Sequence, residues 1–263
     1  MRHVRDAGMF GVRSESASPQ NLLLRALPRR DFERLRPFLE TVPLVPRRVI
    51  QHAKFPVEHL YFIEEGLVSV LATADERDAV EVWLIGREGV VGGPAVLGVN
   101  SSPLRHIVRV GGRALRIGVD DLNSLTTEMP LLRTVLLSYV HVALMQSTQS
   151  TACSLRHPFP QRLARWLLTA QDRSDSDELP MTQALLARTL GVRRATVSET
   201  IKGFERRGVL ARLRGLITIR DRARLEKISC RCYRIIRREQ ERPLRWQTDR
   251  VPLFALQAAC CLV

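Results

Sequence analysis

The chain has 263 residues, 45% of them hydrophobic and 26% charged, so its composition is that of a globular protein of one large or two ordinary domains. Lys and Arg number 41 against 27 Asp and Glu, a formal charge of +14. No run of about 18 apolar residues occurs, and the segment from Met1 to Ser18 lacks the apolar core of a secretory signal. We therefore expect a cytoplasmic protein with no membrane partner.

The excess positive charge is concentrated in the C-terminal part of the chain. Residues 1–154 hold 18 basic and 16 acidic groups, which nearly cancel. Residues 155–242 hold 21 basic and 10 acidic groups, a net charge of +11. A basic region joined to a neutral one indicates that only the C-terminal part contacts a polyanion such as nucleic acid.

The N-terminal part carries two short helical patterns and then strand patterns. Apolar spacing after Pro19 predicts two amphipathic helices separated at Pro28. From Leu60 to Ala72, β-rich runs flank Glu65-Gly66, which predicts a hairpin. Further short strands are predicted over Ala79–Ile85 and Arg105–Val119, with a glycine-rich connection between them over residues 86–98. Short strands with such turn signals are typical of a β-barrel or β-roll.

A long helix is predicted from Pro130 to Cys153, because no other proline or glycine interrupts that stretch. Side chains at alternating spacings of three and four residues form a coiled-coil-like seam: Leu132, Val135, Tyr139, Val142 and Gln146. The helix is apolar on several sides, so we expect it to contact both its own domain and a second copy of the chain. A helix packed only on its own β-domain is the alternative.

The segment from Met181 to Asp221 has the pattern of a winged helix-turn-helix. Thr182 is placed to cap a first helix, Gly191 allows a sharp turn, and a second helix is predicted over Arg194–Arg207. Residues alternating around Gly215 predict the small hairpin called a wing. Any helical bundle contains helix–glycine–helix units, but here arginines stand at both ends of the second helix and on the wing. This distribution of charge favours insertion of the second helix into the major groove of DNA.

The whole plan resembles the Crp/Fnr family of bacterial transcription regulators, most specifically in "QRLARWLL", "LPMTQALLARTLGVRRATVSETIKGFERRGVL" and "GLITIRDRARLE". The resemblance implies an α+β fold with a cyclic-nucleotide-binding-like β-roll, a long dimerisation helix and a C-terminal winged helix-turn-helix. We accordingly divide the chain into a flexible N-terminus (1–18), a β-roll sensor domain (19–128), a dimerisation helix (129–154), a DNA-binding domain (155–240) and an uncertain tail (241–263).

The resemblance also suggests which residues contact DNA. Positions that read bases in the family correspond to Arg194, Ala195, Ser198 and Glu199. We expect phosphate contacts from Thr182, Arg193, Thr196, Lys202, Arg212 and Arg214. The best-known members have Glu at the position of Ala195 and Arg at that of Glu199, so this chain should read a different half-site.

The part of the sequence that would bind an effector departs from the nucleotide-binding members. Those members hold the ribose with a Gly-Glu pair and the cyclic phosphate with an Arg followed by Ser or Thr. Here Gly93 follows Gly92 where the Glu belongs, Ser102-Pro103 falls near the Arg-Ser position, and Arg105 is out of register. We therefore predict only a weak effector pocket at these residues, no cofactor, and loss of cyclic nucleotide binding; a cyclic-nucleotide-responsive regulator is the alternative.

Other sensor chemistries of the family lack support in the sequence. An iron–sulfur sensor needs cysteines near the N-terminus, yet the first is Cys153, and no partner motif accompanies His52, His59 or His106 as a haem ligand. The five cysteines are odd in number and all C-terminal, which argues against a disulfide framework. We interpret Cys153, Cys230 and Cys232 as packed, inert thiols and predict no metal site, with redox or metal sensing as the alternative.

The rival functions are an enzyme and a non-specific nucleic-acid binder. No nucleophile elbow, phosphate-binding loop with lysine or zinc-protease motif occurs, so we predict that the protein is not an enzyme. A basic region alone would bind phosphates without selectivity, and only a measured preference for sequence separates that rival from a regulator. The expected partners are double-stranded DNA and a second copy of the chain, while RNA polymerase and an unidentified small-molecule effector remain open.

Overall fold

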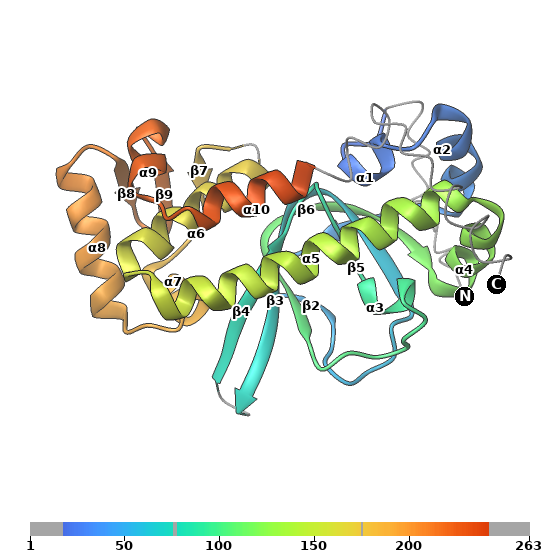
Figure 1. The fold of residues 1–263 in the computed structure, drawn as a ribbon, viewed down its shortest axis with the longest axis horizontal. Coiled ribbons are helices and arrows are strands. Elements are labelled where there is room, and N and C mark those ends of the chain that lie inside the picture. Colours follow the sequence, from blue (N-terminus) through green and yellow to red (C-terminus); the bar gives the residue numbers. More distant parts are fainter. Residues whose placement is uncertain (1–17, 76–77, 175, 242–263) are drawn as a thin grey trace, which may run out of the picture.

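The computed structural model describes residues 18–75, 78–174 and 176–241, and it has the α+β architecture that the sequence predicts (Figure 1). A β-roll with small helices lies at one end of the molecule, and a helical domain with a small sheet lies at the other. The long helix α5 (Pro130–Arg156) runs lengthwise across both. Apart from Ser18 and Glu241, the predicted flexible N-terminus and tail lie outside the described residues.

The N-terminal half contains a six-stranded antiparallel sheet with the order β1-β6-β3-β4, in which β2 also pairs with β6 and β5 with β3. Its elements are α1 (Leu22–Arg25), α2 (Arg29–Leu35), η1 (Arg36–Phe38), β1 (Glu40–Leu44), β2 (Val49–Gln51), β3 (His59–Asp75), β4 (Asp78–Ile85), β5 (Val90–Val91), α3 (Gly93–Val96), β6 (Arg105–Gly118) and α4 (Val119–Glu128).

The C-terminal half consists of helices around a three-stranded sheet of order β7-β9-β8. After α5 its elements are α6 (Phe159–Ser174), β7 (Glu178–Leu179), α7 (Gln183–Leu190), α8 (Arg194–Arg206), β8 (Leu210–Leu213), β9 (Leu216–Ile219), α9 (Arg222–Ile228) and α10 (Cys232–Glu241). The segment between α6 and α7 contains the short strand β7, in which Glu178 and Leu179 pair with Thr218 and Ile217 of β9.

The pair of helices predicted at the start of the roll is confirmed as α1 and α2, which Pro28 separates. Asn21 fixes the first helix in place. Its side-chain oxygen accepts hydrogen bonds from Leu23 N and Leu24 N, while its amide donates to Ile63 O and Gly89 O, both at 2.9 Å. The N-cap residue therefore joins the helix to the sheet as well as capping it.

The predicted hairpin at Glu65-Gly66 is wrong, because β3 continues through it as one long strand. The register of β3 against β6 shifts on both sides of Glu65, so these residues form a bulge rather than a turn. The strands expected within Arg105–Val119 likewise form one strand, β6, which pairs with β3 along most of its length. Gly112 of β6 allows this close approach, since a Cβ there would lie 2.2 Å from Glu65 O.

Replacing Gly66 by alanine should destabilise the roll by about 2–3 kcal/mol. Gly66 has φ +98°, and an added Cβ would lie 2.6 Å from the backbone oxygen of Val110. Gly98→Ala is the matched control, because Gly98 has φ +74° but open space around it. Chemical denaturation measures both variants. Equal losses would mean that the conformational cost alone, and not the contact with β6, explains the need for glycine.

The apolar side chains gather into three main cores. One lies inside the roll, and a second lies between the roll, its small helices and α5. The third belongs to the C-terminal domain and includes Leu67 of β3 and Leu84 of β4. Among the described residues no single helix is long and apolar enough to span a membrane, although α4 and α5, bent by 118° between them, reach that length and composition together.

Candidate nucleic-acid interface

Helix α7 begins and ends as the sequence predicts. The Thr182 hydroxyl caps it by accepting a hydrogen bond from Leu185 N at 3.2 Å. Gly191 ends it in the left-handed conformation, with φ +64°, where a residue without a side chain is favoured. Val192 then packs against the domain core. This cap and turn fix the direction in which the next helix leaves.

Helix α8 lies at the outer end of the molecule, away from the roll (Figure 1). Val197, Ile201 and Phe204, spaced three and four residues apart, are fully buried on its inner side. At its N-terminus, Arg193 makes no side-chain cap, and the first turn contains no acidic residue. The free N–H groups and the positive end of the helix dipole thus face solvent beside an arginine, an arrangement that suits an anion such as phosphate.

The residues expected to contact bases lie on the solvent side of α8. Arg194, Ala195 and Glu199 are exposed, and Ser198 is half-buried. Most of the expected phosphate contacts are also exposed, namely Thr182, Arg193, Lys202, Arg212 and Arg214, while Thr196 is half-buried. The fold therefore places all ten on one domain, on α8, the wing and the start of α7.

The cations of this surface differ in how they are held. Arg212 on β8 forms an ion pair with Glu205 of α8, with Nε 3.5 Å from the carboxylate. Arg207 donates a hydrogen bond to Gly203 O and lies over the Phe204 ring, so it closes the end of the helix. Within the part of the chain that the structure describes, Lys202 and Arg214 have no acidic partner.

The wing is confirmed as β8 and β9, joined at Gly215 with φ +77°. Strand β9 lies between β8 and β7 in the sheet. Strand β7, which precedes α7 in the chain, thereby joins that segment to the wing. Helix–turn–helix and wing thus share one core, which keeps α8 and the tip of the wing in a fixed relation.

Residues 161–228 match the family model described as "Crp-like helix-turn-helix domain". This part of the chain resembles a Crp-like helix-turn-helix domain, and we call it the Crp-like domain. No curated protein matches the chain in sequence.

Solved structures of Crp/Fnr regulators share the fold of the chain at low sequence identity. FixK2 from Bradyrhizobium japonicum is 16% identical with a TM-score of 0.64, over 73% of this chain and 98% of that one. A crp/fnr-family transcriptional regulator from Eubacterium rectale is 15% identical with a TM-score of 0.61, over 78% and 96%. The c-di-GMP-responsive regulator CLP from Xanthomonas campestris is 16% identical with a TM-score of 0.60, over 73% and 98%. The predicted Crp/Fnr-type plan is confirmed in its fold and in its DNA-binding domain.

The Crp-like domain is docked on the roll through buried polar contacts that the sequence did not indicate. The indole N–H of Trp166 on α6 donates to the Glu81 carboxylate of β4 at 2.6 Å. Glu81 also accepts a hydrogen bond from Ser69, which in turn accepts one from Arg109 at 2.7 Å. Burial raises the pKa of Glu81 despite these partners. A carboxyl group on an edge strand of the roll is thus part of a domain interface.

Arg173, near the end of α6, is the most extensively bonded side chain at this junction. It is 3% exposed and forms an ion pair with Glu88, with Nε 2.9 Å from the carboxylate. It donates hydrogen bonds to the side-chain oxygen of Gln146 on α5, at 2.7 Å, and to Leu84 O of β4. One guanidinium therefore joins the Crp-like domain, the roll and the long helix.

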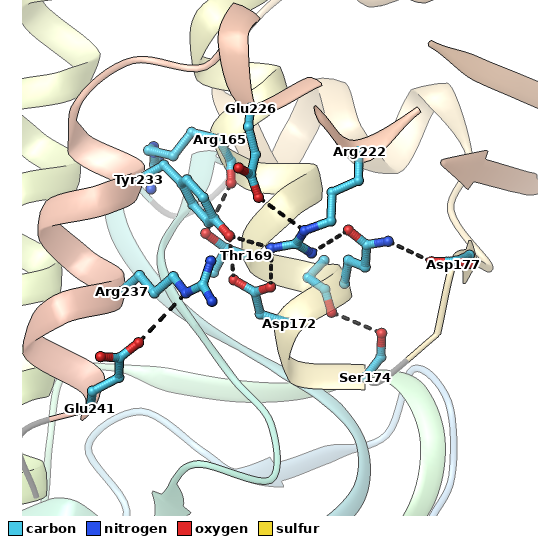
Figure 2. Close-up of polar contacts among 12 residues, drawn as sticks. Arg165, Thr169, Asp172, Ser174, Asp177, Arg222, Glu226, Tyr233, Arg237 and Glu241 are labelled. Atoms are coloured by element: carbon cyan, nitrogen blue, oxygen red, sulfur yellow. Dashed lines mark hydrogen bonds and ion pairs between the residues drawn. The ribbon is translucent and has the colours of Figure 1, made fainter. Parts of the chain in front are cut away.

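A second polar network joins α6, α9 and α10 within the C-terminal part (Figure 2). Arg222 at the start of α9 donates to Gln171 at 2.6 Å, to Asp172 at 2.7 Å and to the Tyr233 hydroxyl at 2.5 Å. Tyr233 donates to the other oxygen of Asp172 at 2.8 Å, and burial raises its pKa to about 12. Helix α10, which follows the matched residues in the chain, is thereby fixed to α6.

Two of the four expected effector residues line a cavity between the roll and α5. Gly93 and Ser102 line this cavity of about 390 Å³, whereas Gly92 and Arg105 are not among its lining residues. Gly92 instead has φ +102° and caps α3. The lining is apolar and contains no Arg, Lys, Asp or Glu: Trp83, Val90, Gly93, Pro94, Leu97, Val99, Ser101, Ser102, Pro103, Leu104, His106, Tyr139, Val140, Ala143, Leu144 and Ser147.

His106 in this cavity wall should make the stability of the roll depend on pH. Burial lowers its pKa from 6.5 to about 4, and its Nδ1 has no hydrogen-bond partner among the described residues. As the pH falls, the His106 imidazole is therefore protonated in the unfolded chain before it is protonated in the folded one. The contribution of the neutral buried ring to the free energy of unfolding is thus present above pH 6.5 and is lost as the pH falls towards 4. It should amount to about 3 kcal/mol.

Chemical denaturation of wild type and His106→Gln at several pH values between 4 and 6.5 gives the free energy of unfolding of each as a function of pH. The contribution of His106 is the difference between the slopes of the two curves. His52→Gln, at an exposed position, is the control and should keep the wild-type slope. Parallel curves for wild type and His106→Gln would show that burial of this ring does not shift its protonation.

The five residues predicted as a dimer seam are buried within the protomer and are not available to a second copy of the chain. All are at most 6% exposed and lie inside the protomer: Leu132, Val135, Tyr139, Val142 and Gln146. The first three belong to the core between the roll and α5, and Gln146 bonds to Arg173. On this face, α5 therefore packs against its own protomer, which is the alternative that the sequence left open. Another stripe of α5 is exposed, at Leu137, His141, Leu144, Thr148 and Leu155.

Proposed function

We propose that the protein is a sequence-specific transcription regulator that binds DNA as a homodimer and reads base edges with α8. The observation that carries the proposal is the outer surface of α8, where Arg194, Ser198 and Glu199 face solvent between the cationic helix start and Lys202. A helix of this kind fits the major groove, and its chemistry suits hydrogen bonding to bases. The Crp-like domain supports DNA binding itself.

The side chains divide into two roles by chemistry. Arg194 reads a guanine through its paired N–H donors, and Glu199 accepts from the amino group of a cytosine. Arg193, Lys202 and Arg214 hold phosphates, together with Arg212 once it leaves Glu205. Ala195 offers a methyl group, which suits contact with a thymine methyl.

Dimerisation uses the exposed stripe of α5 in this proposal. Leu137, Leu144 and Leu155 are 38%, 63% and 81% exposed, and they follow one another at helical spacing with His141 and Thr148 between them. Such spacing over several turns suits a parallel helix pair. Two-fold pairing there presents two α8 helices to half-sites about 10 bp apart.

The cavity beside α5 supports the loss of cyclic nucleotide binding. A cyclic phosphate needs a fixed cation or a set of backbone donors, and no charged side chain lines the cavity. The Xanthomonas regulator is described as c-di-GMP responsive, but an anionic ligand of that kind lacks a charged partner here. A charged effector would therefore find no side chain of opposite charge in this cavity.

The test is selection of bound sequences from random duplex DNA at physiological salt, with the purified full chain and no added ligand. A two-fold symmetric motif is the expected result. Binding without any preferred motif, both alone and with cell metabolite extract added, contradicts sequence-specific regulation and favours the non-specific rival. A motif without two-fold symmetry contradicts the dimer.

Arg194→Ala and Lys202→Ala separate base reading from phosphate binding. Arg194→Ala should lower affinity for the selected site by about 1–3 kcal/mol while leaving random DNA nearly unaffected. Lys202→Ala should weaken both kinds of DNA alike and lower the salt dependence, because it removes one phosphate contact. Fluorescence anisotropy over a salt series measures both variants. Uniform losses in both contradict the assignment of Arg194.

A further inference from the structure

Four side chains with metal-binding atoms converge where α5 ends. They are Cys153, His157, Cys230 and Cys232, and their ligand atoms all lie within 4.8 Å of one another. The Cys153 and Cys230 sulfurs are 3.5 Å apart, and the Cys232 sulfur lies 3.6 Å from His157 Nδ1. All three cysteines are buried, and His157 is half-buried.

The backbone brings the four residues together from two distant segments. Cys153 and His157 stand one turn apart at the C-terminal end of α5, and the His157 N–H bonds to Cys153 O at 3.0 Å. Cys230 and Cys232 flank the turn that ends α9 and begins α10. Sequence spacing alone favours inert thiols, because 72 residues separate His157 from the nearest of the other two cysteines. The fold removes that separation.

The geometry suits a tetrahedral ion. Zinc is bound by cysteine sulfur at about 2.3 Å and by histidine nitrogen at about 2.0–2.1 Å, usually with four ligands in structural sites. A tetrahedron of that size has edges of about 3.8 Å between sulfurs. The Cys153 and Cys230 sulfurs are 3.5 Å apart, and no pair of the four ligand atoms is more than 4.8 Å apart. Three sulfurs and one imidazole nitrogen form one of the usual structural zinc sets.

The surroundings also fit a zinc–thiolate centre. Three thiolates, one neutral histidine and Zn²⁺ sum to one negative charge, and Arg162 and Arg165 both interact electrostatically with Cys153. The Gln149 amide donates to the Cys232 sulfur at 3.1 Å. Hydrogen bonds of this kind hold first ligands in position around a metal.

We propose that Cys153, His157, Cys230 and Cys232 bind one Zn²⁺ per chain and thereby fasten the end of α5 to the start of α10. The ion lies where the long helix gives way to the Crp-like domain. It therefore contributes to the orientation of α6 and α8 relative to α5, and its removal releases the start of α10 from the end of the long helix. A Cys153–Cys230 disulfide and a cluster of packed thiols are the two competing states of these residues.

The test begins with the metal content of the full wild-type chain. The protein is stripped with chelator and reductant, dialysed against Zn²⁺, passed through a desalting column and analysed by elemental mass spectrometry. One zinc per chain is expected, together with a rise in Tm on loading. Replacement by Co²⁺ should give the intense visible absorption of tetrahedral cobalt–thiolate. A reduced wild-type chain that retains no zinc and gives no such spectrum overturns the proposal.

Paired variants assign the ligands. Cys153→Ser/Cys230→Ser should lose the zinc. His157→Ala should weaken zinc binding and shift the cobalt spectrum, whereas His157→Cys should restore one zinc per chain. Cys260→Ser/Cys261→Ser, at positions outside the described residues, is the matched control and should keep one zinc. Equal zinc in the Cys153/Cys230 variant and wild type overturns the assignment, and so does a Cys153–Cys230 disulfide found by mass spectrometry in protein kept under reductant.

Discussion

Replacing Arg173 by methionine is expected to lower the free energy of unfolding by about 3–5 kcal/mol, because it leaves the Glu88 carboxylate buried without its cation. The Glu88 side chain is only 12% exposed, and Arg173 is also the donor to Leu84 O and Gln146. Methionine keeps most of the volume of the arginine stem, so the loss measures the polar contacts rather than a cavity. Urea denaturation followed by circular dichroism measures it.

Two further variants make this prediction specific to the ion pair. Glu88→Gln in the Arg173→Met background should recover part of the loss, because it removes the unpaired charge. Arg30→Met, at an exposed arginine of α2, should change stability by no more than about 0.5 kcal/mol. A loss for Arg173→Met no larger than that control would show that the buried pair contributes nothing to holding the domains together.

Phe204→Ala is expected to cost about 3–5 kcal/mol, since it removes a fully buried ring from beneath α8. The ring packs in the core of the Crp-like domain, and Arg207 lies over it, 5.6 Å from its centroid. The same change should abolish DNA binding wherever the domain is unfolded. Thermal denaturation and anisotropy on one sample measure both effects.

Glu199→Ala serves as the control for Phe204→Ala on the same helix. Its side chain is exposed, so stability should stay within about 0.5 kcal/mol of wild type while base preference changes. If Phe204→Ala bound the selected DNA as wild type does, at a temperature where it is unfolded by circular dichroism, the connection between this core and α8 would be wrong.

The parts of the fold that sequence predicts are those with local signals. The cap at Thr182, the left-handed turn at Gly191 and the helical spacing of Val197, Ile201 and Phe204 each lie within a few residues of what they determine. The prediction of a hairpin at Glu65-Gly66 is wrong because a glycine in a strand pattern is compatible with either a turn or a bulge. Pairing with β6, distant in sequence, decides between them.

The face of α5 could not be assigned from periodicity. Apolar residues occur on several sides of this helix, and two stripes of similar spacing compete for the two partners. The stripe through Val135 and Tyr139 packs on the roll, and the stripe through Leu137 and Leu144 faces solvent. Only the position of the roll distinguishes them.

The contacts that the sequence analysis does not predict are those between residues that are far apart in the chain. Arg173 and Glu88 are charged residues of the type usually found at the surface, and nothing near either in sequence indicates that they meet. The cluster of Cys153, His157 and Cys230 is missed for the same reason. The positions expected to read bases, by contrast, do lie on the solvent side of α8, because the inner side is defined by its own apolar residues.

The core of the Crp-like domain also affects how the protein can be dissected. Leu67 and Leu84 of the roll belong to the same apolar cluster as Leu163 and Trp166 of α6. A fragment cut before α6 would expose that surface to water and leave the Trp166 indole without Glu81. Such a fragment would lack part of its own interior, so it is a poor substitute for the full chain in measurements of DNA affinity.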